Sequence, residues 1–258
     1  MKNNLSVIND IDCIRLELAR LRANGIQSLY RGQSDVSWKI TSSLKRIQGD
    51  DTIEELWSKY ESSFAELSTQ LKKREYLKYK PEKEDVNFYL LSIARHLGFP
   101  CNLIDWTSSL DMALYAACHE NFYKDGCLFI ISGNLKINEG QNRIDPFKIK
   151  ESVIVCKDFD FFPDECGLTD LPLARKRRFR QNGFFSIISK ADTEMDYEYL
   201  LPDDISIHKI IIPNTLKSEV IDLMQRSGRS SEWYLLDNQF ADASRVLTYR
   251  VKSKYLND

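Results

Sequence analysis

The sequence contains few of the residues that build metal centres or perform thiol chemistry. It has three histidines and six cysteines among 258 residues, and no two cysteines are spaced as C-x-x-C. Cys118 and His119 are adjacent but have no second pair nearby, so no metal site is expected. The scattered cysteines instead predict structural thiols in a reduced, cytoplasmic protein.

Long apolar runs and a strong net charge are also missing. The N-terminus, MKNNLSVINDIDCIRLEL, is interrupted by Asn, Asp and Arg, unlike a secretory signal. No stretch approaches the roughly 18 apolar residues that a membrane-spanning helix needs, so no membrane contact is expected. The formal net charge of -2 provides no overall attraction for nucleic acid, which would require a local basic patch.

The hydrophobic periodicity predicts helices first and strands later, which favours one α+β domain over regular βαβ winding. A strand is expected at Tyr30-Arg31-Gly32, before most of the helices. Further strands are predicted at residues 127–132, 151–156, 184–189 and 208–213. Helices are predicted at residues 9–24, 52–75, 86–97, after Ser108 or Ser109, at 214–228 and at 231–247.

The first polar cluster is Arg31-Gly32-Gln33, at the end of the early strand. An arginine cannot lose its charge in a protein, so its place at the end of an apolar strand requires a partner. One interpretation is a phosphate or other anion at the strand end, with Gly32 letting the ligand approach the backbone. The other is an arginine that caps the strand or pairs with a surface carboxylate.

The second cluster is Asp105-Trp106-Thr107-Ser108-Ser109, at a junction between a strand and a helix. Its hydroxyls and the amides of the helix N-terminus suit a phosphate or an amide of a ligand. The alternative is an N-cap beside a buried tryptophan. Neither serine lies in a G-x-S-x-G motif, so a hydrolase elbow is not supported.

The third cluster lies in ARKRRFRQNGFF, residues 174–185. Its basic residues precede a predicted strand, with Phe179 among them. They suit a pyrophosphate, or nucleic-acid phosphates with a base stacked on the phenylalanine, and the alternative is a solvated face. His96 is a candidate proton shuttle, although a histidine at a helix end more often bonds nearby backbone. The basic residues are Arg175, Lys176, Arg177, Arg178 and Arg180.

These clusters resemble the Phe-Arg-Gly (FRG) domain family of bacterial and phage-associated proteins. The matching segments are YRGQSDVSWKITSSLKR (30–46), ARHLGFPCNLIDWTSSLDMALYAA (94–117), RRFRQNGFF (177–185) and YLLDNQFADASRVL (234–247). The resemblance implies one structural domain, with residues 29–258 as the FRG domain and residues 1–28 as an N-terminal helix packed on it. Tyr30 stands where the family has phenylalanine, and Cys101 stands where a threonine is expected.

The FRG family in turn is similar to ADP-ribosyltransferases, which implies a split mixed sheet flanked by helices. By position, Arg31 resembles the arginine or histidine of those enzymes, and Thr107 with Ser108 resembles their second-strand cluster. Gln181 stands where they often have a glutamate, and a glutamine cannot act as a general base. Carboxylates that could replace it are Asp105, Glu165, Glu194 and Glu198.

The resemblance implies an enzyme that uses NAD as a substrate, with Arg31, Thr107 and Gln181 as catalytic residues. It implies transfer of ADP-ribose to a macromolecule. The basic run before Gln181 favours RNA or DNA slightly over protein as the acceptor, and no metal is expected. It also implies a toxin in phage defence or a toxin–antitoxin pair, with a neutralising protein partner. The alternatives are a non-catalytic module that binds a nucleotide or nucleic acid, and an NAD hydrolase. The implied NAD-binding residues are Arg31, Gly32, Gln33, Trp106, Thr107 and Ser108.

Overall fold

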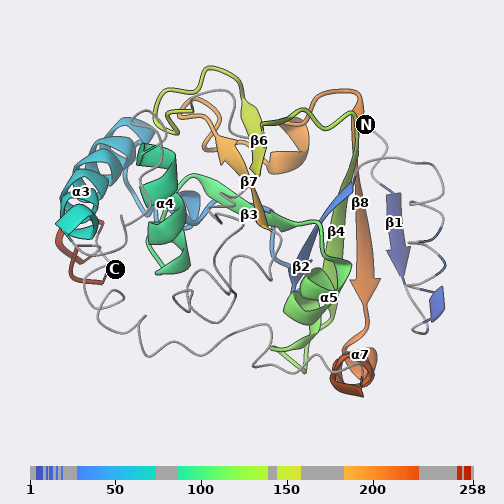
Figure 1. Ribbon diagram of the computed structural model, residues 1–258. Coiled ribbons are helices and arrows are strands. Elements are labelled where there is room, and N and C mark those ends of the chain that lie inside the picture. The colour runs from blue at the N-terminus through green and yellow to red at the C-terminus, as the bar shows by residue number, and fades with distance from the viewer. Residues whose placement is uncertain are drawn as a thin grey trace, which may run out of the picture.

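The core of the protein is a mixed β-sheet. The computed structural model describes residues 4–7, 10, 12–13, 16, 19, 28–73, 86–138, 144–157, 183–226, 249–251 and 253–256. In this part of the chain, eight strands form one sheet in the order β1-β8-β4-β2-β3-β7-β6-β5. Figure 1 shows α3 and α4 beside one half of the sheet, and α5 and α7 beside the other. The α+β fold class predicted from the sequence is confirmed.

The first half of the sheet is antiparallel around β4. It consists of β1 (Asn4–Val7), β8 (Ile205–Ile212), β4 (Gly126–Gly133) and β2 (Ser28–Gln33). β4 pairs with both β2 and β8, and β1 is parallel to β8. In β4, Leu128 and Ile130 join one apolar cluster, whereas Phe129 and Ile131 join another. This alternation shows that β4 is covered on both faces, which explains its continuous apolar sequence.

The second half of the sheet is centred on β7. It consists of β3 (Leu103–Thr107), β7 (Gly183–Ile188), β6 (Val153–Lys157) and β5 (Ile137–Asn138). β7 is antiparallel to both β3 and β6, and β5 is parallel to β6. The strand GFFSII is buried almost throughout because it is central in this half.

The two halves of the sheet meet at a single registered pair. β2 and β3 are antiparallel, and Tyr30 lies opposite Thr107. The residues that follow in β2, from Arg31 on, are registered with β4 and not with β3. A continuous ladder would have closed this junction with backbone hydrogen bonds, so its loss leaves room for side chains between the two strands.

Helices cover the sheet and form its cores. Their bounds are α2 (Ser43–Arg46), α3 (Ile53–Lys73), α4 (Val86–His96), α5 (Leu110–Cys118), the 3-10 helix η3 (Tyr197–Tyr199) and α7 (Asn214–Arg226). α3 begins with a capping box, in which Thr52 N donates to Glu55 Oε2 at 3.0 Å and Glu55 N donates to Thr52 Oγ1 at 3.3 Å. α3 and α4 pack with β3 and β7 around Tyr60, Leu91 and Phe185.

α5 packs directly on the backbone of β2 and β4. A Cβ atom added to Gly32 would lie 1.8 Å from the carbonyl oxygen of Ala113. One added to Gly126 would lie 2.4 Å from the carbonyl oxygen of Ala117. The sequence LDMALYAAC permits this contact because Ala113 and Ala117, the residues closest to the two glycines, have small side chains. Gly32 therefore lets a helix, rather than a ligand, approach this face of the strand.

The end of β2 is tied to α7 by a buried lysine. Lys217 is fully buried, and its Nζ donates to the carbonyl oxygens of Ser34 at 2.7 Å, Glu120 at 3.0 Å and Asn121 at 3.0 Å. A buried ammonium group is costly unless its protons are all bonded, and here three carbonyls accept them. The segments after β2 and after α5 are thus held together.

Most of the predicted elements are present within a few residues of the expected bounds. β8 begins at Ile205 rather than at residue 208, and Ser109, not Ser108, caps α5 by accepting a hydrogen bond from Met112 N at 3.4 Å. The predicted 9–24 helix is described at five of its residues, of which residues 12, 13, 16 and 19 are helical and residue 10 lies in a bend. The predicted 231–247 helix lies outside the described ranges. The elements that were not predicted from the sequence are β1, β5, α2 and η3.

Candidate functional site

Arg31 points into the junction between the two halves of the sheet. Its Nη1 donates to the backbone carbonyl of Asp105 at 2.8 Å and lies 3.7 Å from Asp105 Oδ2. This bond satisfies a carbonyl of β3 close to the point where the registered pairing of β2 and β3 ends. The side chain is largely buried, so the strand ends on a charge that is removed from bulk water.

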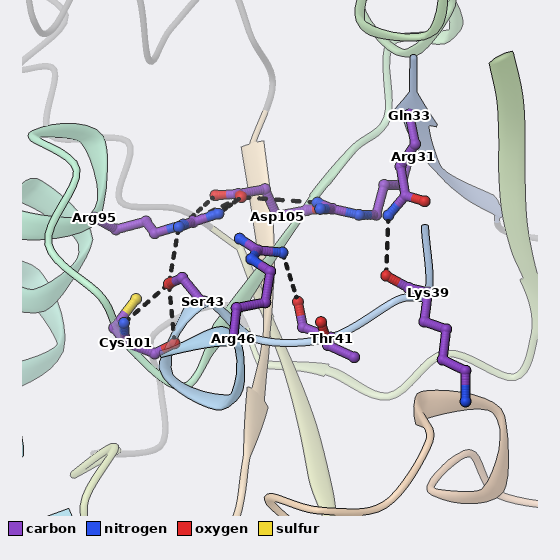
Figure 2. A network of polar contacts seen from close by, with 9 residues as sticks. All are labelled: Arg31, Gln33, Lys39, Thr41, Ser43, Arg46, Arg95, Cys101 and Asp105. Carbon is purple, nitrogen blue, oxygen red and sulfur yellow. Dashed lines mark hydrogen bonds and ion pairs between the residues drawn. The ribbon is translucent and has the colours of Figure 1, made fainter. Parts of the chain in front are cut away.

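Asp105 is held from its other side by Arg95 of α4. Arg95 Nε donates to both carboxylate oxygens at 3.3 and 3.2 Å, and Arg95 Nη2 donates to Oδ2 at 2.5 Å. Burial lowers the pKa of Arg95, but the charge of Asp105, its hydrogen bonds and the influence of Cys101 together raise this pKa above its ordinary value. Figure 2 shows the Asp105 carboxylate between the guanidinium groups of Arg31 and Arg95.

A third guanidinium, that of Arg46 in α2, completes the arginine cluster, defined here as Arg31, Arg46 and Arg95 with Asp105. Arg46 Nη1 donates to the carbonyl of Thr41 at 3.3 Å, and Figure 2 shows its guanidinium below those of the other two arginines. Burial lowers the pKa of Arg46, and the positive charge of Arg95 lowers it further. Arg46 is therefore in an electropositive environment.

α2 is anchored so that Arg46 is placed in the cluster. Ser42 caps the helix by accepting a hydrogen bond from Lys45 N at 3.1 Å. Ser43 Oγ accepts from Arg95 Nη1 and from Cys101 N, both at 3.0 Å. The contact between Cys101 and Ser43 is made by the backbone of Cys101. Burial raises the pKa of the Cys101 thiol, which therefore stays protonated.

The cluster carries more positive than negative charge. Among the described residues, Asp105 is the carboxylate whose charge acts on all three arginines. Three positive charges less one negative charge leave an excess of two. Burial lowers the pKa of Arg31, as do the charges of Arg95 and Arg46, while Asp105 opposes them. Arginine remains protonated, so the cluster pays a free-energy cost that a bound anion would reduce.

Two further polar atoms at the site are buried without a partner among the described residues. They are Nε of Arg31, a donor, and Oε1 of Gln33, an acceptor. Gln33 Nε2 donates to the carbonyl of Lys39 at 3.4 Å, so the amide is oriented with its oxygen unpaired. Buried polar atoms nearly always have partners, and unpaired ones indicate a binding site for water or a ligand.

The structure of residues 105–109 contains the N-cap and the buried tryptophan of one interpretation, and it places Asp105 of the other interpretation among the arginines. Trp106 is buried in the core, with its ring centroid 5.5 Å from that of Tyr197, so it does not line an open site. Thr107 Oγ1 accepts from Ser109 N at 2.9 Å, which fits the N-cap interpretation. Ser108 is exposed. Successive side chains of β3 point to opposite faces of the sheet, so Asp105 and Thr107 both lie on the face opposite to Trp106.

Several predicted residues lie outside the described ranges. They are Gln181, Glu165 and the basic residues from Arg175 to Arg180. β7 begins at Gly183, directly opposite Thr107. His96 is the last residue of α4, and its side chain is likewise not described.

The two other candidate carboxylates are not in the arginine cluster. Glu194 lies 3.8 Å from Lys45 Nζ and accepts from Gln48 Nε2 at 3.1 Å, at the surface beside α2. Glu198 lies half-buried in η3. The carboxylate that the structure places among the arginines is therefore Asp105.

Arg46 and Arg95 were not predicted from the sequence as site residues. Both lie in the segments that carried the family resemblance, SLKR and ARHLGFP, but neither stands in a polar cluster of its own. Arg95 is the less conspicuous of the two because its neighbours belong to an apolar helix. The signal that could have found it is a charged residue on the buried side of that helix, next to Ala94.

Comparisons with known proteins give one family match. Residues 27–126 match the family model of the FRG domain. No curated protein and no solved structure matches the chain. No helix in the described ranges is long and apolar enough to cross a membrane. The matched range contains Arg31, Arg46, Arg95 and Asp105, so the complete arginine cluster lies in the part of the chain that is similar to the FRG domain.

Proposed function

We propose that this protein is an NAD-dependent ADP-ribosyltransferase that binds the pyrophosphate of NAD at the arginine cluster. The observation that carries the proposal is the excess of two positive charges around Asp105. Each phosphate of NAD carries one negative charge, so the pyrophosphate would balance this excess. Guanidinium groups are also the side chains best suited to bind phosphate oxygens in pairs.

The residues present suit the chemistry of ADP-ribosyl transfer. Cleavage of the bond between nicotinamide and ribose passes through an oxocarbenium-like transition state with a good leaving group, so positioning is the main task of the protein. The arginines would fix the pyrophosphate. The unpaired Nε of Arg31 and Oε1 of Gln33 offer one donor and one acceptor to a further polar group of the ligand. Thr107 would lie at the same junction.

One observation favours a second candidate, a module that binds a nucleotide without reacting with it. The Asp105 carboxylate is engaged by Arg95 and Arg31, so it is a poor general base. Gln181 stands where ADP-ribosyltransferases often have a glutamate, and a glutamine cannot act as a general base. A binding module would use the same charge excess and leave NAD intact.

One experiment separates these candidates. The protein is incubated with NAD labelled in its adenylate and with RNA, DNA or cell lysate, and both label transfer and free nicotinamide are measured. Label in a macromolecule supports a transferase, and nicotinamide release without label identifies an NAD hydrolase. ADP-ribose binding without either product identifies the binding module. Absence of ADP-ribose binding refutes the proposed site.

Arg31→Ala tests the role of the cluster. We expect a folded protein with at least about 100-fold weaker ADP-ribose binding, because a charge-assisted contact with the phosphates is lost. The matched control is Arg250→Ala, which removes an exposed arginine from the C-terminal helical residues. Equal binding by the two variants would remove Arg31 from the site.

A toxin role is part of the proposal, as the FRG resemblance implies, with a neutralising protein as partner. Expression of the wild-type chain in a bacterium should arrest growth, and expression of Arg31→Ala should not. Growth arrest by both variants at equal protein levels would separate toxicity from the arginine cluster.

A further inference from the structure

Arg46 differs from the other two arginines of the cluster in its exposure. It is an exposed residue at the end of α2, and its contact with Thr41 also lies at the surface. The side chains of Arg31 and Arg95 are only 14% and 17% exposed. Arg46 is therefore the arginine of the cluster that a ligand in solvent can reach most readily.

The two buried arginines are engaged by contacts within the protein. Arg95 donates to the Asp105 carboxylate from two of its nitrogens and to Ser43 Oγ from the third. Arg31 donates to the backbone carbonyl of Asp105, and its Nε is enclosed without a partner among the described residues. These contacts hold both guanidinium groups in place and use part of their donor capacity.

The Arg46 guanidinium keeps most of its donors free. Among the described residues it donates only to the carbonyl of Thr41, at 3.3 Å, and it forms no ion pair. The exposed carboxylate beside α2, that of Glu194, contacts Lys45 and Gln48 instead. A guanidinium has five N–H donors in a planar fork that matches a phosphate group. Arg46 can therefore bind phosphate oxygens without giving up a contact to a carboxylate.

The backbone of α2 fixes the place of Arg46 in the cluster. Leu44 is fully buried, and its N donates to the carbonyl of Cys101 at 3.1 Å. Figure 2 shows the Arg46 guanidinium below and between those of Arg31 and Arg95. The Arg95 charge lowers the pKa of Arg46 more than the Asp105 charge raises it, so a bound anion would relieve this repulsion.

We propose that Arg46 makes the arginine cluster select a pyrophosphate, with two adjacent negative charges, over a nucleic-acid phosphodiester, with one. The three arginines and Asp105 leave an excess of two positive charges, which a pyrophosphate balances. Without Arg46 the excess is one, which a single phosphodiester balances. The ligand class is therefore a nucleoside diphosphate ester, and this assignment rests on the proposed binding of NAD at the cluster.

The test is isothermal titration calorimetry of the wild-type chain and of Arg46→Gln with two adenosine ligands. ADP-ribose carries a pyrophosphate, and adenylyl-adenosine carries one phosphodiester. We expect the wild-type protein to bind ADP-ribose more tightly than adenylyl-adenosine. Arg46→Gln should weaken ADP-ribose binding roughly 10- to 100-fold, the effect of one hydrogen-bonded charge. It should weaken adenylyl-adenosine binding by no more than about 5-fold, the effect of one exposed charge.

Two further variants separate a ligand contact from a structural role. Arg46→Lys keeps the charge but loses the planar fork, so it should recover part of the affinity that Arg46→Gln loses. Arg226→Gln is the matched control, because Arg226 is also an exposed arginine that ends its helix, and it should bind both ligands like the wild-type protein. Without ligand, Arg46→Gln should melt no lower than this control, since it loses one long hydrogen bond and the repulsion from Arg95.

Chemical modification of arginines provides a measurement that needs no variant. Butanedione reacts with exposed guanidinium groups, and the modified peptides are identified by mass spectrometry. Arg46 should be modified in the free protein and protected by ADP-ribose, but not by adenylyl-adenosine at the same concentration. Arg226 should be modified to the same extent in all three samples.

Four outcomes would overturn selection by Arg46. They are equal ADP-ribose affinity of Arg46→Gln and Arg226→Gln, equal losses for the two ligands, modification of Arg46 that ADP-ribose does not reduce, and a ligand-free melting temperature of Arg46→Gln well below that of the control. The same data keep the two proposals apart. ADP-ribose binding that depends on Arg46, without label transfer from NAD, refutes the transferase and leaves the selection intact. ADP-ribose binding that does not depend on Arg46 refutes the selection alone.

Discussion

Replacing Asp105 by asparagine removes the negative charge that the three arginines share. Asparagine has nearly the same shape and keeps an oxygen that accepts a hydrogen bond from Arg95, so the change is mainly electrostatic. Breaking a buried ion pair costs about 3–5 kcal/mol. The Asp105 side chain is 40% exposed, so water screens part of the effect, and we expect a loss of about 2 kcal/mol.

A loss of this size lowers the melting temperature by roughly 4–8 °C in a protein of this length. An added anion should restore stability, because a ligand that binds only the folded state stabilises it by about 1.4 kcal/mol at ten times its Kd. Thermal melts of Asp105→Asn in increasing pyrophosphate should therefore rise more steeply than those of the wild-type protein.

The matched control is Asp196→Asn, since the Asp196 side chain is 38% exposed and pairs with the exposed Lys39 alone among the described cations. A surface pair of this kind contributes about 0–1 kcal/mol. The control should lose little stability and show the wild-type response to pyrophosphate. If Asp105→Asn melts like the control and responds no more strongly to pyrophosphate, the arginine cluster is not an anion site.

Three further predictions concern the support of the site. Gly32→Ala should cost at least about 3 kcal/mol in urea unfolding or prevent folding, because its Cβ would lie 1.8 Å from the Ala113 carbonyl. Lys217→Met should cost about 3–5 kcal/mol in urea unfolding, since three carbonyls lose the ammonium group that they bind. Asp35 should stabilise the fold in a pH-dependent way. Its hydrogen bonds to Lys124 and Ser37 lower its pKa from 3.8 to about 2, so its contribution is complete above pH 3.8 and is lost as the pH falls towards 2.

Each of these predictions has a contradicting result. Gly49→Ala is the control for Gly32, because a Cβ there meets nothing within 4 Å and its cost comes only from a φ of 55°. An equal loss of unfolding free energy in the two variants would show that the contact with α5 does not restrict the side chain at residue 32. Near-normal stability of Lys217→Met would mean that water replaces the ammonium group. If Asp35→Asn unfolds between pH 4 and 2 with the wild-type profile, the titration belongs to other carboxyls.

The elements that the sequence predicted well are those with strong local signals. α3 has a capping box at Thr52 and an amphipathic pattern, and β4 has a continuous apolar run, so both were placed within a few residues. β1 and β5 were missed because they are short and are stabilised by pairing with distant strands. α2 has only four residues and depends on Ser42 as its cap.

The candidate site shows the same division. Arg31 was predicted as a site residue because a permanent charge ends an apolar strand next to a glycine. Gly32 was predicted to let a ligand approach the backbone, and in the structure α5 packs closely against it at Ala113, 81 residues further along the chain. Trp106 was given a place beside the ligand, and the structure buries it against Tyr197.

Local periodicity and side-chain chemistry are enough to predict the α+β class, the main helices and strands, and a charged strand end that needs a partner. That Arg46 and Arg95 join Arg31 around Asp105 becomes visible only in the folded chain. Electrostatic energy depends on distance in space, and residues from α2, α4, β2 and β3 meet only after the chain folds.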